Sequence, residues 1–169
     1  EYFALGALFE IGRAEAALNN IRAHYGSILS KGATTVWEEW GGATSQSHGW
    51  GAAPTCHAGR YILGVEPLEP GFKLFGVFPT TGSLNKASGR IPCPQGIIEA
   101  EWEKKAPGLT LQMSVPEGAS ARAGLPLDGA EGRLALDGSL CRDAEIITLR
   151  RGRYITCRLE PGRHELTLT

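Results

Sequence analysis

The spacing of the hydrophobic residues changes near residue 65, and this change divides the chain into two unlike parts. Before it, apolar residues recur three or four positions apart, as in amphipathic helices. They form two stripes: Tyr2, Leu5, Leu8 and Phe9, and then Ala14, Ala17, Leu18, Ile21, Tyr25 and Ile28. Gly12 and Gly32 follow these stripes and are expected to end two helices. A third helix is predicted from Gly51 or Pro54 to Leu63, with Pro54 confined to its first turn.

From about Glu66 onward, apolar and polar residues alternate. The clearest runs are 98–102, 109–115, 155–159 and 166–168. Such alternation predicts antiparallel strands with one buried face and one wet face, so that Thr156, for example, is expected on a wet face. Turn residues recur at 106–108, 116–118, 128–129, 137–138, 151–152 and 161–162. This density of turns favours a β-sandwich.

The predicted fold class is therefore α+β, with three N-terminal helices followed by an antiparallel β-sandwich. The boundary is expected at residues 64–71, where two prolines make a stiff connector. Three short helices cannot enclose a core of their own. Either they lie on the sheet, or they are the end of a helical domain that begins elsewhere. Residue 1 is glutamate and Met113 is the only methionine, which suggests that the chain is cut from a longer protein.

Composition argues against several partners and cofactors. The formal net charge of −1 gives no field that would attract nucleic acid, and no apolar run approaches the ~18 residues of a membrane span. The four cysteines form no C-x-x-C pair, so we expect free thiols, no zinc site and a reducing compartment. No phosphate-binding or dinucleotide-binding motif is present. We predict no cofactor and no metal.

The segment 33–50 follows neither a helical nor a strand period, and it concentrates reactive side chains. It holds three tryptophans, two adjacent glutamates and one histidine. Glycoside hydrolysis uses carboxyl groups, and aromatic faces stack on sugar rings. Neighbours in an extended segment point to opposite sides, so Glu38 and Glu39 cannot both face one pocket. Composition does not select between them. The plainer interpretation is a solvated Glu pair, a tryptophan core and a structural histidine.

Several ordered motifs in this region resemble one family. Residues 32–40 (GATTVWEEW), 45–50 (SQSHGW) and 60–65 (RYILGV) resemble the C-terminal part of bacterial α-L-rhamnosidases of glycoside hydrolase family 78. Residues 67–72 (PLEPGF) are similar to that family's junction into a C-terminal β-sandwich. Residues 89–102 (GRIPCPQGIIEAEW) are similar to the start of that sandwich.

The resemblance implies an inverting enzyme that releases terminal L-rhamnose, with an (α/α)6 barrel followed by a small β-sandwich. Residues 1–65 would be the last helices of a truncated barrel, and residues 66–169 the sandwich. The resemblance further implies that Glu38 is the general base, that His48 contacts the sugar, and that Trp37 and Trp40 shape the pocket wall. The general acid of the family lies outside this sequence. We therefore expect the isolated chain to be inactive.

Two other functions remain open at this stage. One is an inverting hydrolase on the same barrel with a different sugar preference. The other is a non-catalytic β-sandwich that docks on a helical domain or binds carbohydrate. If the chain comes from an α-L-rhamnosidase, its partner is a rhamnoside, which the longer parent protein binds. We expect neither nucleic acid nor a membrane as a partner. A helical face carrying Phe3, Phe9, Trp37 and Trp50 would also be apolar enough to self-associate, unless it packs on the chain's own sheet.

Overall fold

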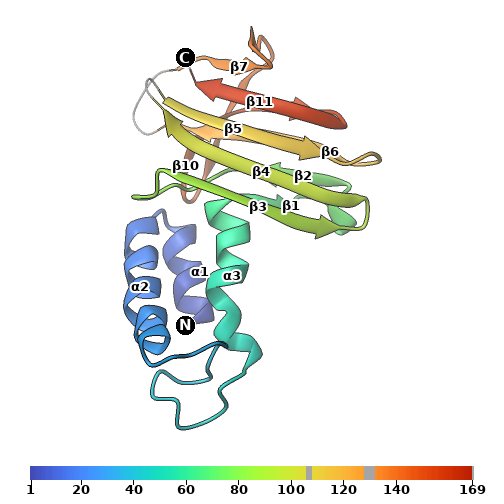
Figure 1. The fold of residues 1–169 in the computed structure, drawn as a ribbon. Coiled ribbons are helices and arrows are strands. Elements are labelled where there is room, and N and C mark those ends of the chain that lie inside the picture. Colours follow the sequence, from blue (N-terminus) through green and yellow to red (C-terminus); the bar gives the residue numbers. More distant parts are fainter. Residues whose placement is uncertain (106–107, 128–131, 169) are drawn as a thin grey trace.

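The computed structural model describes residues 1–105, 108–127 and 132–168, and it has a helical part beneath a two-sheet sandwich (Figure 1). The first two helices are α1 (Tyr2–Glu10) and α2 (Ala14–Ser30). The third is continuous from a 3₁₀ turn, η1 (Gly49–Ala52), through α3 (Ala53–His57) to a π-helical turn, η2 (Ala58–Ile62). The predicted fold class, three helices followed by a β-sandwich, is confirmed.

The helices form where the sequence pattern placed them. Leu5 and Phe9, one turn apart in α1, are fully buried, and the predicted stripe of α2 faces inward. Gly12, in a left-handed conformation with φ of 74°, lies in the joint between the two helices. Pro54 occupies the first turn of α3, where its missing N–H is not needed. These short helices draw their stability from packing against one another and against the sandwich.

Over the described ranges, one sheet has five strands in the order β1-β2-β6-β10-β9, and the other has six in the order β3-β4-β5-β11-β7-β8. The first contains β1 (Val65–Pro67), β2 (Leu74–Val77), β6 (Ser120–Pro126), β9 (Glu145–Leu149) and β10 (Gly152–Leu159). The second contains β3 (Lys86–Cys93), β4 (Gly96–Lys105), β5 (Gly108–Val115), β7 (Leu134–Leu136), β8 (Ser139–Leu140) and β11 (Gly162–Leu168). A short 3₁₀ turn, η3 (Pro70–Phe72), joins β1 to β2.

Antiparallel pairing dominates, but β2 and β6 are parallel, with Phe75 opposite Ala121. This pair differs from the purely antiparallel arrangement that the alternation predicts. After β2 the chain crosses to the other sheet for β3, β4 and β5, and then returns to the same end at which β2 began. A strand entered from that end runs parallel to its neighbour. Residue alternation carries no information about this return path.

Alternation along the strands predicts most of the core. Ile98, Ala100 and Trp102 of β4 are buried, whereas the intervening glutamates are not. Thr156 is an exception, because it was expected on a wet face and is almost fully buried. Its methyl group packs where a Cβ on Gly124 would fall, and its hydroxyl donates to the backbone oxygen of Glu145. Both contacts come from the neighbouring strands β6 and β9, so Thr156 is buried between them and the simple rule of one wet face fails there.

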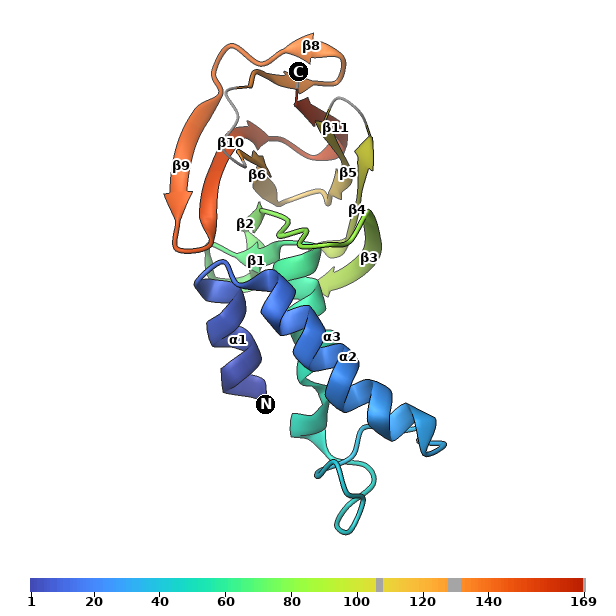
Figure 2. The same cartoon turned by 90° about the vertical axis from the view of Figure 1, so that its left-hand side faces the viewer.

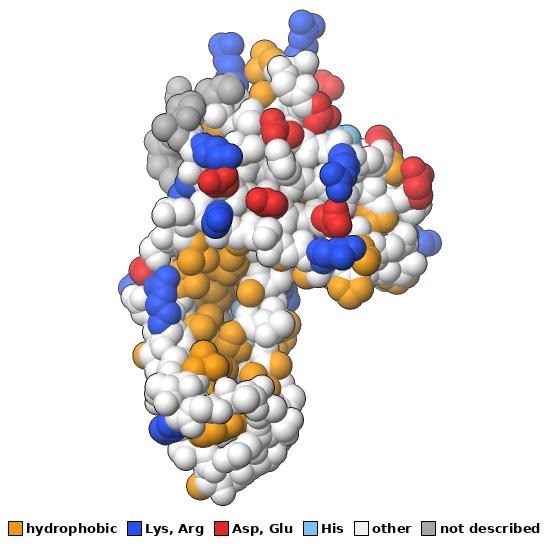
Figure 3. Space-filling model, in the orientation of Figure 1, with side chains coloured by type: hydrophobic (Ala, Val, Ile, Leu, Met, Phe, Trp, Pro, Cys, Tyr) orange, Lys and Arg blue, Asp and Glu red, His pale blue; other side chains and the backbone are white. Residues whose placement is uncertain are grey.

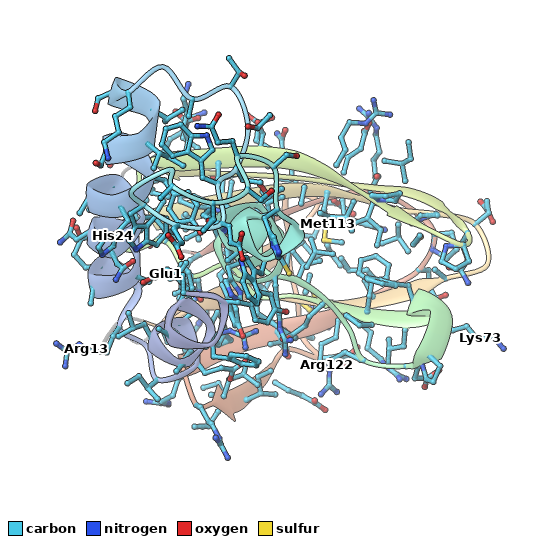
Figure 4. All side chains as sticks on the ribbon, turned by 90° about the horizontal axis from the view of Figure 1, so that it is seen from below. Glu1, Arg13, His24, Lys73, Met113 and Arg122 are labelled. Atoms are coloured by element: carbon cyan, nitrogen blue, oxygen red, sulfur yellow. The ribbon has the colours of Figure 1, made fainter. Side chains whose placement is uncertain are left out.

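A few strong contacts fix the helical part to the sandwich. The Trp102 indole N–H donates to the backbone oxygen of Ile62 over 2.7 Å, and the Thr80 N–H donates to that of Tyr61 over 2.8 Å. Viewed at right angles, the helices extend away from one end of the sandwich (Figure 2). Seen from below, Arg13 and His24 mark the side that carries the helical hairpin, and Lys73 marks the opposite side (Figure 4). The hairpin thus underlies only part of the strands.

Two expectations about exposure are corrected by the structure. Phe9 and Trp37, named as part of an open apolar face, are buried. Phe9 stacks on Tyr61 with ring centroids 5.0 Å apart, because α1 packs directly against the third helix. The large apolar side chains that are exposed on the helical part and its loop are Tyr2, Phe3, Ile11, Leu29 and Trp50. Apolar side chains gather along the helical part, whereas charged ones cluster on the visible face of the sandwich (Figure 3).

Some sequence expectations fall on residues outside the described ranges. The predicted turns at 106–108 and 128–129 fall wholly or partly within residues 106–107 and 128–131, which the structure does not describe. The turn at Asp137-Gly138 is observed, with φ of 51° and 78°, between β7 and β8. All four cysteines are unpaired. Among the described residues, no helix is long and apolar enough to cross a membrane.

Candidate functional site

The candidate site lies in the loop between α2 and η1, at the end of the helical part away from the sandwich (Figure 1). Backbone bonds hold the two arms of this loop side by side. The Glu38 N–H donates to the Ser45 oxygen over 2.8 Å, and the His48 N–H donates to the Val36 oxygen over 2.9 Å. The Thr35 hydroxyl adds a bond to the backbone oxygen of Gln46. These hydrogen bonds bring Glu38 and His48, ten positions apart in sequence, next to each other.

The structure brings Glu38 and His48 together. The Nε2 atom of His48 lies 3.9 Å from Oε1 of Glu38, and the two side chains are 35% and 27% exposed. Oε2 of Glu38 accepts the Ser45 N–H over 3.2 Å. Because 3.9 Å is longer than a hydrogen bond, Oε1 stays available to a water molecule or a sugar hydroxyl. A carboxylate held in this way has one oxygen anchored and the other free to accept a proton.

Glu39 has a different environment. Its side chain is exposed, and its backbone oxygen accepts the Gly42 N–H at the loop tip. Since composition left the choice between the two adjacent glutamates open and the resemblance implied Glu38, this contrast is informative. Only Glu38 lies against His48. Glu39 serves as a natural control for experiments on Glu38.

Trp37 and Trp40 organise the loop in two separate places. Trp37 is buried, and a Cβ added at Gly42 would lie 2.7 Å from its ring, so the loop tip folds directly onto it. Trp40 reaches α2, where it stacks on His24 with ring centroids 4.9 Å apart and meets Tyr25 edge-on. Both fix the loop that presents Glu38 and His48.

Sequence reasoning missed the role of Trp50 in this arrangement. Its ring stacks on His48 at a centroid distance of 4.4 Å and an interplanar angle of 30°. The only signal in the sequence was its position two residues after the histidine. The Nδ1 atom of His48 is buried and has no hydrogen-bond partner among the described residues. The imidazole is thus held on its face by Trp50, with Glu38 at its Nε2 edge.

Two hollows elsewhere on the described surface are less suited to proton transfer. One, of about 690 Å³, lies on the six-stranded sheet. Several of its polar side chains are already paired: Glu99 with Arg90 at 3.3 Å and with Arg163 at 3.1 Å, and Glu165 accepts a hydrogen bond from Gln112 over 2.8 Å. The second, of about 290 Å³, lies between the joint of α1 and α2 and the sandwich. Within the described ranges, no three His, Cys, Asp or Glu side chains cluster as metal ligands would.

Comparison with known proteins agrees with this fold. Residues 64–135 match the family described as the bacterial α-L-rhamnosidase C-terminal domain. An α-L-rhamnosidase of Formosa agariphila is 27% identical over 152 residues, which are 81% of this chain and 16% of that protein. The GH78 family rhamnosidase of Bacillus sp. GL1 is 32% identical, with a TM-score of 0.67 over 75% of this chain and 15% of its own.

An α-L-rhamnosidase of Streptomyces avermitilis, solved in complex with L-rhamnose, has the same fold. Its TM-score is 0.72 at 20% identity, over 98% of this chain and 17% of its own. The helices joined to a β-sandwich thus have the fold of the C-terminal part of these glycoside hydrolases. More specifically, residues 64–135 match the C-terminal domain of bacterial α-L-rhamnosidases, and the chain as a whole is similar to the C-terminal part of such enzymes. It spans only about a sixth of the length of these relatives.

Proposed function

We propose that this chain acts as the base-carrying C-terminal part of an inverting hydrolase that cleaves terminal α-L-rhamnosides. The observation that carries the proposal is the juxtaposition of Glu38 and His48, 3.9 Å apart and both reachable by solvent. In this proposal residues 1–65 are the last helices of an (α/α)6 barrel, and residues 66–169 are the sandwich that supports them. L-rhamnose as the sugar is supported by the names of the relatives.

The chemistry assigns a distinct role to each side chain. In an inverting hydrolase the base takes a proton from a water molecule that attacks the anomeric carbon, on the face opposite the leaving group. Oε1 of Glu38 is the acceptor for that proton, while Oε2 stays bonded to the Ser45 N–H. His48 binds a sugar hydroxyl through Nε2. Trp37 and Trp40 keep the loop in shape and form part of the pocket wall.

The proton for the leaving group must come from a second carboxyl group. Inverting enzymes hold their two carboxyl groups roughly 6.5–9.5 Å apart, with the attacking water between base and sugar. We place this acid in a part of the longer protein that precedes residue 1. The isolated 169-residue chain should therefore show no measurable turnover of a chromogenic rhamnoside. Turnover by that chain would contradict the divided site.

Glu38→Gln, made in the longer protein that contains this chain, tests the role of Glu38 as the base. The substitution preserves size but removes the proton acceptor, so kcat on p-nitrophenyl α-L-rhamnopyranoside should fall about 10²–10⁴-fold, the usual contribution of a general base. The acidic limb of the pH profile of kcat/KM should disappear with it. Initial rates between pH 4 and pH 9 check both effects.

Glu39→Gln is the matched control, because it makes the same chemical change on the adjacent exposed residue. Its kcat should stay within about twofold of the unmodified protein, as is usual for a surface substitution. Thermal unfolding should show that both variants are folded. Full turnover by the Glu38 variant would refute the assignment and favour the non-catalytic module.

A further inference from the structure

The smaller hollow, of about 290 Å³, lies where the start of α2 meets the sandwich. Gly12 of the helical joint lines it, and a Cβ there would lie 3.2 Å from the backbone oxygen of Arg151. Figure 2 shows this joint beside the turn between β9 and β10. Residues 79–82, in the loop that follows β2, also line the hollow. Three segments far apart in the sequence therefore meet at this place.

The first turn of α2 brings unused backbone donors to the hollow. Its first two residues, Ala14 and Glu15, are part of the lining. The helix has no side-chain cap, and in the described part of the chain the N–H groups of Ala14, Glu15 and Ala16 have no hydrogen-bond partner. Such N–H groups, at the positive end of the helix dipole, attract anions.

Thr81 adds a buried hydroxyl group that lacks a partner. Only 7% of this residue is exposed, and it lines the hollow. Its hydroxyl makes no hydrogen bond to any described residue. Since the hydroxyl oxygen is not sealed from solvent, it opens into the hollow that the residue lines. A hydroxyl buried in this way costs free energy unless a bound group satisfies it.

The charged side chains that line the hollow are mostly cationic. They include Lys104, Arg151 and Arg153. Arg151 is already paired with Glu66. Lys104 donates to the backbone oxygen of Gly82 over 2.7 Å, which uses one of the three N–H bonds of its ammonium group. The Arg153 guanidinium has no partner among the described residues. Lys104 and Arg153 are thus available to an anion, on a chain whose formal net charge is −1.

Glu15 is the one acidic side chain in this lining, and its oxygens are already in use. Oε2 accepts the Ser83 N–H over 3.0 Å, and Oε1 lies 3.3 Å from the Arg22 guanidinium. The hydrogen bonds from Ser83 hold the pKa of this carboxyl below its ordinary value, and Arg22 adds to the effect. Glu15 is therefore ionised and paired. The groups that remain for a ligand are donors and cations.

From these contacts we infer that the hollow binds a tetrahedral oxyanion, a sulfate or phosphate group. Its oxygens can accept bonds from the α2 N–H groups, the Thr81 hydroxyl and a cation at the same time, whereas a carboxylate has only two oxygens. The group could be a free ion or an ester on a sugar, because both present the same oxygens. This site does not depend on the proposed function, since it lies at the sandwich end of the helical part. A bound oxyanion links the joint of α1 and α2 to the sandwich.

NMR on the ¹⁵N-labelled 169-residue chain tests the inference. Sodium sulfate, sodium phosphate and glucose 6-sulfate are added in turn at pH 7, with NaCl used to hold the ionic strength constant. The backbone signals of Ala14, Glu15, Ala16 and Thr81 should shift and saturate. Signals of single residues are needed, because sulfate stabilises folded proteins in general. Equal Kd values for sulfate and glucose 6-sulfate would support a site for the esterified group, and binding of the ions alone a site for the free anion.

Thr81→Val removes the hydroxyl and keeps the shape of the side chain. It should weaken sulfate binding about 10-fold, the usual effect of losing a hydrogen bond to a charged group. The stability of the anion-free chain in urea should not fall, because the hydroxyl has no partner to lose. A hydroxyl with a purely structural role would give the opposite pair of results.

Arg153→Gln should weaken sulfate binding about 3-fold, as expected for an exposed cation. Arg150→Gln is the matched control, because Arg150 is exposed in the same turn but does not line the hollow. It should leave the Kd unchanged, since only a side chain that reaches the hollow can contact the anion.

Three results would overturn the inference. In the first, the signals of the α2 start and Thr81 do not saturate, or NaCl alone shifts them equally. In the second, Thr81→Val binds sulfate with an unchanged Kd. In the third, Arg150→Gln weakens binding as much as Arg153→Gln, which would make the attraction a general effect of surface charge. None of these bears on Glu38, which the turnover of Glu38→Gln tests separately.

Discussion

Gly64 lies where the helical part joins the sandwich, and only glycine fits at this position. It lies between the end of η2 and the start of β1, with φ of 83°. A Cβ at this residue would lie 2.3 Å from the carbonyl carbon of Phe78 and 2.4 Å from the nitrogen of Pro79. Its own backbone oxygen accepts the Phe78 N–H over 2.9 Å. Both the left-handed conformation and the close backbone approach require glycine here.

Gly64→Ala should therefore destabilise the chain by about 3 kcal/mol, because the backbone strain and the steric overlap add. Gly32→Ala is a matched control, since Gly32 has nearly the same φ of 84° but nothing within 4 Å of its Cβ position. It should cost only about 1 kcal/mol, the strain alone. Urea unfolding followed by far-UV circular dichroism measures both. Equal losses in the two variants would show that the contact with Phe78 and Pro79 is unimportant.

At the scale of elements, residue spacing was enough to predict the helices and most of the strands. The spacing of apolar residues is informative because a helix or strand buries one face, and the residues on that face recur with the period of the element. It could not predict the parallel pairing of β2 with β6, since that depends on the path of the intervening strands. Nor could it predict the burial of Thr156, because that burial depends on which residues of β6 and β9 lie beside it, such as Gly124.

The candidate site was predictable in part. Composition drew attention to the loop without choosing between Glu38 and Glu39; the family resemblance implied Glu38, and the geometry of the loop is consistent with that choice. The cross-links between the arms of the loop, such as the Glu38 N–H to the Ser45 oxygen, bring Glu38 against His48. Such contacts depend on how an irregular segment folds, and no period encodes that. The stacking of Trp50 on His48 was missed for the same reason.

A polar network joins α1, the third helix, β1 and the turn before β10. The Tyr61 hydroxyl donates to Glu10 over 2.8 Å, and the Arg60 guanidinium lies 3.6 Å from Glu10 and 3.8 Å from Glu66. Arg151, whose side chain is only 4% exposed, is paired with Glu66. Burial and the bond to Glu10 raise the pKa of Tyr61 to about 12, from an ordinary value near 10.

This shift predicts how stability depends on alkaline pH. Below pH 10 the phenol keeps its proton in both the folded and the unfolded chain. Between pH 10 and pH 12 the unfolded chain releases this proton while the folded chain keeps it, so the free energy of unfolding should fall as pH rises. Tyr61→Phe should be less stable at pH 8 by about 1 kcal/mol, for the lost hydrogen bond, yet fall less steeply above pH 10. Urea unfolding from pH 8 to pH 11.5 checks this. A constant difference between the two proteins across that range would contradict the prediction.

At the scale of the whole molecule, the sandwich and the helical part have different surfaces. The sandwich buries a large apolar core and presents many charged pairs, whereas the helical part exposes several large apolar side chains (Figure 3). Three of these, Phe3, Leu29 and Trp50, lie toward the end of the helical part away from the sandwich. Because α1 and α2 run antiparallel, Phe3 and Leu29 lie at helix ends that point away from the sandwich, and Trp50 lies in η1, which follows the loop. An apolar end of this kind gains free energy when it is covered.

We therefore expect the 169-residue chain to associate with a second copy through this apolar end. Sedimentation velocity over a range of protein concentrations should show a monomer in equilibrium with a dimer, and ammonium sulfate should favour the dimer, because it strengthens apolar burial. Replacing both Phe3 and Leu29 by serine should weaken association about 10-fold or more, since each loses a large exposed apolar surface. Ile146→Ser is the control, because Ile146 is comparably exposed but lies on β9 of the sandwich. A chain that stays monomeric at every concentration would refute this expectation. A dimer weakened by the change at Ile146, and not by the changes at Phe3 and Leu29, would move the interface to the sandwich.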